Sequence, residues 1–445
     1  MEGAAAVLRK PLGWGGVLLA GLLGTIMTFS YLGGFLDPVR HLAGLKVGIV
    51  DEDAPVTVAG NRIDGGAQVV EGLLAEGRKE VEWVRYPTRA AALEAIHDNQ
   101  IIGAVDVRPG FSQALGDIGV AGGKAPAAQI VMLSNDGAGL FQGQVFGRVT
   151  REVEHEVNWS ANEQLVGVLA DVGIQIDPAG AARVGRPVSV RTVDVVSVEG
   201  RTARGLAPFY TAVMATLTGF LAASVTSLMV DVLRGTEHLE LLGEELHVEA
   251  VEERPVSTWI SKAVLAVSGA CLGGLAVAFV SVVILDMPSL GFWPTAGLAA
   301  LGATAIALVT LIFLTLFGIG GELLGVLFTT IFGVPAALGV YPVEALPPFF
   351  RFLSSWHPMH YLTDGMRALI FYDGRAAAGM ERAVVVLTIW IVGAALVGYL
   401  SARLIERRGG QVGTGVKDKT HRHLRHGRPG KLPAHLDPAT DAPAG

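Results

Sequence analysis

Long apolar segments alternate with polar stretches along the chain of 445 residues. A helix that crosses the hydrocarbon core of a bilayer needs about 20 apolar residues. Four segments fit one such helix each, namely Leu12–Leu36, Ala207–Val230, Trp259–Leu285 and Ala383–Leu404. A fifth segment, Thr295–Tyr341, is long enough for two helices, and a glycine-rich interruption at 318–322 divides it near the middle. The pattern therefore predicts an α-helical membrane protein with six transmembrane helices.

The first apolar segment has two interpretations, an anchor that stays in the membrane or a cleaved signal peptide. A signal peptide has an apolar core of roughly 7–15 residues and small residues at its cleavage site. The segment here is longer, contains no charge, and is not followed by a convincing A-x-A site. We therefore expect residues 1–37 to form an uncleaved N-terminal transmembrane anchor.

Residues 38–204 have the pattern of a soluble domain in which strands and helices alternate. Strand patterns occupy Lys46–Asp51, Val81–Tyr86, Ile101–Val107 and Gln129–Leu133, and helical spacing occupies Thr88–Asn99 and Val145–Leu169. Alternating strands and helices are typical of an α/β domain. A domain of roughly 165 residues can bury its own core. We predict an α/β extracytoplasmic domain inserted between helices 1 and 2, before a five-helix membrane domain at 205–404.

Lys and Arg residues cluster beside both ends of the predicted membrane region. Arg9 and Lys10 precede the first helix, and the segment 403–431 after the last helix is rich in both residue types. Basic residues mark the cytoplasmic side of a membrane. Both termini are therefore predicted to be cytoplasmic, with loop 231–258 inside and segment 342–382 outside. The composition of 405–445 predicts a basic, disordered cytoplasmic tail.

The overall composition agrees with a membrane location and limits the chemistry of the chain. Hydrophobic residues make up 51% and charged residues 17%, and the single cysteine excludes an intrachain disulfide. There is no G-x-S-x-G motif, and His97 and His155 have no metal-ligand spacing to another His or Cys. Gly122–Lys124 is followed by Ala125 and lacks the upstream glycine of a Walker A motif. We expect no enzymatic activity, no metal and no bound cofactor in this chain.

Five segments together carry a resemblance to a known family. They are KVGIVDEDAP at 46–55, ALEAIHDNQIIGAVDVRPGFSQAL at 92–115, ARGLAPFYTAVMATLTGF at 203–220, the Arg-Gly-Thr of 234–236 with Pro-Val-Ser at 255–257 and Lys262, and LPPFFRFLSSWHPMHYLTDGMRALIF at 346–371. In this order they resemble the ABC-2-type transporter permease family, and specifically its YhgE/Pip-like (DUF3533-like) branch. The resemblance implies a bacterial inner-membrane protein that works as a homodimer or heterodimer of permeases. It also implies a separate ABC ATP-binding subunit that would bind the ATP.

The loop 231–258 is the candidate contact surface for such an ATPase. Thr236 can cap a helix whose first turn holds Glu237. Leu239, Leu242 and Leu246 recur at helical spacing and would form one apolar side. Together with Arg234 and Glu322, these are the ATPase-contact candidates. Two alternatives stay open: the helix only rests on lipid, and Glu322 is simply a carboxylate at a helix start.

The outer segment 342–382 contains too many prolines and polar residues for a full transmembrane helix. Short helices that dip into the outer leaflet fit its pattern. They would shape a lateral exit for an amphiphile, with an aromatic belt at the interface as the alternative. The candidate exit residues are Phe349, Phe350, Trp356, Pro358, Tyr361 and Arg367.

The function expected from these features is export of an amphiphilic or lipid-like substrate with a separate ATPase subunit. Asp231, Asp286 and Glu322 sit at predicted helix ends, so we expect no charge within the spans, unlike a proton-driven transporter. The alternative is a non-transporting membrane scaffold or receptor, similar to a phage-infection protein or a type VII secretion accessory. Membrane lipids and partner subunits, and no nucleic acid, are the expected binding partners.

Overall fold

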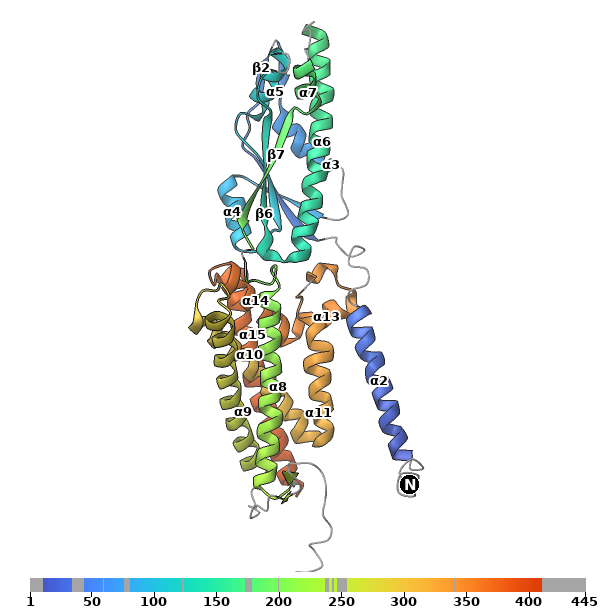
Figure 1. The fold of residues 1–445 in the computed structure, drawn as a ribbon, viewed down its shortest axis with the longest axis vertical. Coiled ribbons are helices and arrows are strands. Elements are labelled where there is room, and N and C mark those ends of the chain that lie inside the picture. Colours follow the sequence, from blue (N-terminus) through green and yellow to red (C-terminus); the bar gives the residue numbers. More distant parts are fainter. Residues whose placement is uncertain are drawn as a thin grey trace, which may run out of the picture.

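The computed structural model describes residues 11–33, 44–58, 60–75, 81–121, 124–172, 178–198, 200–236, 240–241, 244–245, 254–339 and 341–409. This part of the chain is elongated, with an α/β unit at one end and a helical bundle at the other (Figure 1). Within it, five helical segments are long and apolar enough to cross a membrane, namely Ala207–Leu233, Pro255–Ile284, Phe292–Phe317, Ile319–Ala336 and Ala376–Arg407. These helices indicate a multi-pass membrane protein.

The bundle is built from long helices that approach each other closely. They are α8 (Ala207–Leu233), α9 (Pro255–Ala278) with its π-helical extension η3 (Phe279–Ile284), α10 (Phe292–Phe317) and α15 (Glu381–Arg407). A Cβ added at Gly219 of α8 would lie 2.1 Å from the backbone oxygen of Ala303, and one at Gly274 of α9 would lie 2.4 Å from the backbone nitrogen of Ala300. Small residues thus let α8 and α9 pack against α10 at backbone distance, as is common in membrane helices.

The interruption predicted in the longest apolar segment is present at Gly318. Helix α10 ends at Phe317 and α11 (Ile319–Val326) begins two residues later, continued by the π-helix η4 (Leu327–Phe332) and by α12 (Gly333–Ala336). Gly318 has φ 56° and ψ −133°, a backbone conformation that residues other than glycine rarely adopt. The prediction of two helices joined by a tight turn is therefore confirmed.

The N-terminal helix α2 (Pro11–Gly33) touches the rest of the protein near its last turns. The Ser30 hydroxyl donates to the carbonyl oxygen of Ile331 at 2.5 Å, and the Tyr31 hydroxyl donates to that of Thr330 at 3.1 Å. Both acceptors belong to η4. The remainder of α2 stands apart from the bundle (Figure 1).

The α/β unit is organised around a five-stranded mixed sheet with the order β4-β1-β5-β6-β7. Its strands are β1 (Leu45–Asp51), β4 (Val81–Tyr86), β5 (Gly103–Val107), β6 (Ala128–Asn135) and β7 (Val188–Val196). Strand β1 pairs in parallel with β4 and β5, β6 runs antiparallel to β5, and β7 runs parallel to β6. The first four match the predicted strands closely; β7 and the small hairpin of β2 (Val56–Val58) and β3 (Asn61–Ile63) were not predicted.

Helices cover the two faces of this sheet unequally. One face packs against α3 (Gly65–Ala75), α5 (Phe111–Val120) and the 33-residue α6 (Leu140–Val172), with α7 (Pro178–Gly185) at the far end. The other face packs against α4 (Arg89–His97) and against residues from the membrane-side segment 368–378. A short 3₁₀ turn, η2 (Asp136–Ala138), connects β6 to α6 near this second face.

The segment between the fourth and last spans forms short helices, as predicted. They are the 3₁₀ turn η5 (Val343–Ala345), α13 (Pro348–Trp356), α14 (Pro358–Phe371) and the π-turn η6 (Ala376–Met380) that leads into α15. Pro348 and Pro358 occupy first-turn positions of their helices, where the missing amide hydrogen costs nothing. The prolines therefore start these helices.

The helix predicted in loop 231–258 is wrong where the loop is described. Residues Glu240–Leu241 (β8) and Glu244–Glu245 (β9) pair as a small antiparallel hairpin. Gly243 lies between the two strands in the sequence, and glycine in a helix interior costs about 1 kcal/mol relative to alanine. The prediction of a helix used only the leucine spacing and did not take this glycine into account.

Candidate functional site

A buried ion pair joins α8 and α9 beside the 231–258 loop. Lys262 Nζ lies 2.7 Å from Asp231 Oδ2 and donates a second hydrogen bond to Ser227 Oγ at 2.9 Å. The Lys262 and Asp231 side chains are only 3% and 5% exposed, and Arg234 Nη1 lies 3.9 Å from Asp231 Oδ1. Charges removed from water are stable only when they are well paired, so this pair fixes the two helix ends together.

Two of the ATPase-contact candidates lie at this cluster. Arg234 caps the end of α8, and Thr236 bonds to the carbonyl oxygen of Asp231 through both its hydroxyl, at 2.9 Å, and its amide, at 3.0 Å. Glu322 lies in the first turn of α11 and is not part of the cluster. Four candidates lie outside the described residues: Glu237, Leu239, Leu242 and Leu246.

The structure places Lys262 further inside its helix than predicted. Helix α9 begins at Pro255, four residues before the predicted start, because Arg254 is extended and Pro255 suits the first helical position. Lys262 therefore sits two turns inside α9, and α8 extends beyond Asp231. Treating Pro255 as a helix start would have revealed this register.

A buried histidine fixes the bend between α13 and α14. His357 Nδ1 accepts a hydrogen bond from the Met359 amide at 3.2 Å, and Nε2 lies 3.1 Å from the carbonyl oxygen of Phe328 in η4. With Nδ1 acting as acceptor, Nε2 carries the proton and donates a hydrogen bond to the carbonyl oxygen of Phe328. Burial lowers the pKa of His357 from 6.5 to about 4, so the ring is neutral. His357 thus links the outer segment to the fourth span.

Acidification should destabilise the protein through His357. Between pH 6.5 and pH 4 the unfolded chain binds a proton that the folded protein excludes, so stability is lost as pH falls through this window. From pH 7 to pH 5 the loss should be about 2 kcal/mol, and His357→Gln should remove it. Thermal unfolding in detergent at the two pH values measures this, with His155→Gln on the exposed side of α6 as control. An unchanged pH dependence in His357→Gln would contradict it.

The aromatic exit candidates contact different neighbours. Phe349 and Phe350 of α13 meet Phe29 of α2, with ring centroids 6.4 and 6.0 Å apart. Trp356 lies 6.0 Å from Trp390 of α15, whose indole N–H donates to the Trp356 carbonyl oxygen at 3.0 Å. These side chains therefore tie α13 to the first and last helices.

The other three exit candidates lie in α14 and stabilise that helix. Pro358 begins the helix, and the Tyr361 hydroxyl donates to the carbonyl oxygen of Ser355 at 2.5 Å. Arg367 pairs with Asp364 at 2.9 Å and donates to the Leu338 carbonyl oxygen at 3.3 Å. The six predicted residues brace the outer segment and do not converge on one site.

An apolar cleft of about 350 Å³ lies beside this segment, between α10, α14 and the start of the last span. Its lining consists of Leu290, Pro294, Gly297, Leu298, Leu301, Leu369, Gly374, Met380 and Val384. The amide of Leu290 donates to the Leu369 carbonyl oxygen at 2.9 Å, which ties the segment before α10 to α14. This cleft was not predicted, because its walls come from three separate parts of the chain.

The α/β unit and the bundle share a joint at Tyr372. The Tyr372 ring is 2% exposed and packs among residues of β1, α4 and β6. Its hydroxyl lies 2.9 Å from the side-chain oxygens of both Asn99 and Asn135, and burial raises the pKa of this phenol, which keeps it protonated. Arg375 Nη1 pairs with Asp98 at 2.9 Å on the rim of the same joint. The two parts of the molecule thus share one hydrophobic cluster at this joint.

The carboxyl end of the sheet is filled by the chain's own acidic residues. Ligands of α/β sheets commonly bind where the strand order reverses, here between β1 and β5. The Asp53 carboxylate accepts from the Ser112 amide at 3.1 Å at the start of α5, and Glu52 accepts from the Arg89 amide at 2.9 Å at the start of α4. The two helix N-termini that would suit an anion are therefore occupied.

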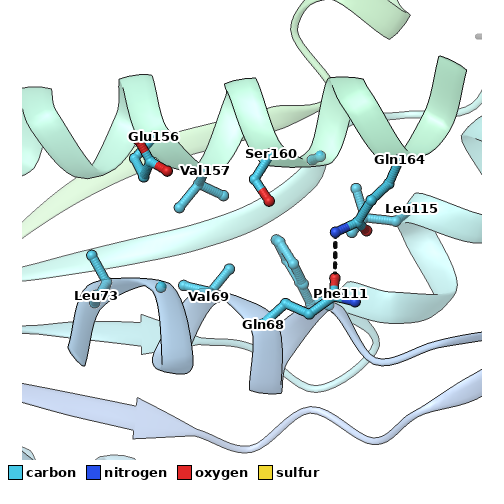
Figure 2. Close-up of a pocket in the computed structure, with 12 residues that line it drawn as sticks. Gln68, Val69, Leu73, Phe111, Leu115, Glu156, Val157, Ser160 and Gln164 are labelled. Carbon is cyan, nitrogen blue, oxygen red and sulfur yellow. Dashed lines mark hydrogen bonds between the residues drawn. The ribbon is translucent and has the colours of Figure 1, made fainter. Parts of the chain in front are cut away.

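A second cavity in the α/β unit is too small for a substrate. It measures about 40 Å³ between α3, α5 and α6. Gln164 of α6 donates to Gln68 of α3 at 2.6 Å, and Figure 2 shows this bond crossing between the two helices. Such a volume holds a few water molecules. Of these two cavities, only the cleft in the bundle is large enough for a substrate.

The sequence matches the family described as "Protein of unknown function (DUF3533)" over residues 16–396. This match extends from the N-terminal helix into the last span, and the chain belongs to that family. Comparisons with curated proteins and with solved structures gave no match.

Proposed function

We propose that the chain is the membrane permease subunit of an ABC-2-type exporter that moves an amphiphilic or lipid-like compound. The observation that carries this proposal is the buried Lys262–Asp231 pair at the loop ends of α8 and α9. Ionisable side chains inside membrane helices are costly, and they are retained mainly where they serve function. A rigid joint at the base of a loop suits a protein on which a partner acts through that loop.

The geometry of α8 supports transmission from the loop to the opposite end of the bundle. Asp231 lies near one end of α8, and Thr211 near the other end is buried 3.7 Å from the sulfur of Met287. Helix α8 also packs against α10 and α14 in the interior of the bundle. Since α14 leads directly to Tyr372, movement of α8 would reach the α/β unit.

The energy source would be a separate ATP-binding subunit, because this chain has no Walker A motif. Arg234 and Thr236 hold the start of the loop on the Asp231 cluster. The loop is rich in glutamate, and an acidic surface is poorly suited to the anionic inner leaflet. A protein partner is therefore favoured over lipid alone.

The proposed arrangement places the protein in the bacterial inner membrane with both termini in the cytoplasm. Helix α2 would be one further span, which makes six in total, and its 23 residues are long enough to cross the hydrocarbon core. The α/β unit would then be extracytoplasmic. The YhgE/Pip-like branch of the ABC-2 permeases, with its pairing of two permease subunits, is the assignment that the segment resemblance favours.

A second candidate function is that of a non-transporting scaffold or receptor, similar to a phage-infection protein or a type VII secretion accessory. The observation that favours it is α6, which extends along the α/β unit toward the end away from the bundle (Figure 1). Trp159 on this helix is 67% exposed. Large exposed aromatic side chains are typical of protein-binding surfaces.

Crosslinking from the loop separates the two candidates. A photoreactive amino acid placed at Leu242 should crosslink to an ATP-binding protein in native membranes, which would also show that the loop is cytoplasmic. The same photoreactive residue at Trp159 is the matched control and should not capture that protein. Crosslinks from position 242 to lipid alone would contradict the exporter proposal.

A further inference from the structure

The apolar cleft beside α14 has the composition of a hydrocarbon-binding site. All nine lining residues are leucine, glycine, proline, methionine or valine. Its inner wall is formed by buried Leu298 and Leu369, which come from α10 and α14. A water molecule needs two to four polar partners to be held in a protein, and this lining offers few. The cleft is therefore suited to an apolar occupant.

The side chains around the cleft mouth face away from the protein. Of the lining residues, Leu290 is 51% exposed and Val384 is 43% exposed. Pro294 to Leu301 form the first turns of α10 and Val384 lies in α15, and both of these helices are long and apolar enough to cross a membrane. In a bilayer the mouth would open sideways toward lipid chains near one interface.

We propose that this cleft holds one acyl chain of a lipid-like amphiphile drawn from the surrounding leaflet. Its volume of about 350 Å³ falls at the small end of ligand pockets, which suits one chain better than two. An apolar cleft open to lipid fills with hydrocarbon, because hydrocarbon is the only component of the membrane core. The role of the cleft as the substrate-binding surface of an exporter rests on the proposed function. Its role as a lipid-binding site does not depend on that function.

The position of the cleft gives its occupant access to the joint with the α/β unit. Leu369 and Gly374 line the cleft, and Tyr372 between them inserts into the α/β core. A Cβ on Gly374 would come within 2.8 Å of Leu290, so the segment 369–374 packs tightly against the cleft wall. An acyl chain in the cleft would thus contact the segment that holds the α/β unit.

Gly297 provides a way to fill the cleft without disturbing its walls. It lines the cleft, and an added Cβ would have no heavy atom within 4 Å. Substitution by alanine, valine and leucine should therefore occupy the space in steps. Gly393 of α15 also has no atom within 4 Å of an added Cβ and does not line the cleft, so Gly393→Leu is the matched control.

The test uses a phospholipid with a diazirine in one acyl chain, mixed into vesicles of phosphatidylethanolamine and phosphatidylglycerol that contain the full-length protein. After irradiation, label should concentrate on peptides 290–301 and 369–384. Gly297→Leu should lower labelling of these peptides about fivefold, because its side chain takes the space of the acyl chain, with Ala and Val intermediate. Gly393→Leu should leave it unchanged.

Even labelling of all exposed apolar helix faces, with no response to the Gly297 series, would overturn the cleft assignment. That outcome would leave the exporter proposal standing, because no ATPase takes part in the measurement. Specific labelling in a protein that recruits no ATPase would keep the lipid site and remove the transport function.

Discussion

Replacing Asp231 by asparagine is expected to lower the free energy of unfolding by about 3–5 kcal/mol. Asp231 lies against Lys262 and Arg234, and both of these basic side chains are at most 7% exposed. Without the carboxylate, the buried Lys262 loses its ion-pair partner and still lies near the Arg234 guanidinium. Chemical unfolding in detergent, followed by helix content, measures the loss.

The matched control is an exposed ion pair in the same molecule. Arg62 and Asp64 lie 3.2 Å apart on the surface of the α/β unit, and Arg62→Ala should cost less than about 1 kcal/mol. The double variant Asp231→Leu with Lys262→Met should recover much of the lost stability, because paired removal leaves no buried lysine charge. If Asp231→Asn costs no more than Arg62→Ala, the buried pair does not join α8 to α9 as described.

The double variant also separates stability from function. It would restore packing without the ion pair between α8 and α9, so the variant should fold. Movement of the loop should nevertheless pass poorly to the rest of the bundle. In an exporter this appears as ATP hydrolysis that no longer responds to substrate. A folded double variant with full transport would show that the charges serve stability alone.

Replacing Tyr372 by alanine is expected to cost about 3–5 kcal/mol, as for other large aromatic side chains truncated in a core. The ring is among the largest fully buried side chains, and it fills the contact between the bundle and the α/β unit. The loss should be local, so that the α/β unit unfolds or separates before the bundle. Limited proteolysis between residues 196 and 207, together with thermal unfolding, measures this separation.

Tyr372→Phe isolates the contribution of the hydroxyl. It leaves the ring in place but removes the donor between Asn99 and Asn135, which should cost about 1–3 kcal/mol. Tyr210→Phe, at an exposed position on α8, is the control and should have little effect. A single unfolding transition that is unchanged in Tyr372→Ala would contradict a shared core.

The elements of this fold were largely predictable where one local pattern decides them. Uninterrupted apolar runs located the bundle helices, and Gly318 marked the hairpin because only a glycine adopts its backbone conformation readily. Short runs rich in apolar residues located β1, β5 and β6, and alternation of polar and apolar residues located β4. Strand β7 was missed because seven of its nine residues are exposed or only partly buried, which leaves a weak pattern.

The contacts that build the candidate sites were not predictable in the same way. Asp231 and Lys262 are 31 positions apart, and only the register of two packed helices brings them together. Tyr372 and Asn135 are 237 positions apart and meet because a membrane-side helix docks on a sheet. Periodicity reports which face of an element is buried, but it does not identify the partner across the interface.

Purification of the tagged protein from its own membranes in mild detergent tests whether this chain is the permease of an ATP-driven exporter. Mass spectrometry then identifies the proteins that accompany it. An exporter permease should bring with it a stoichiometric ATP-binding subunit with a Walker A motif. Secretion or envelope proteins without any ATP-binding subunit would contradict it and favour the scaffold function.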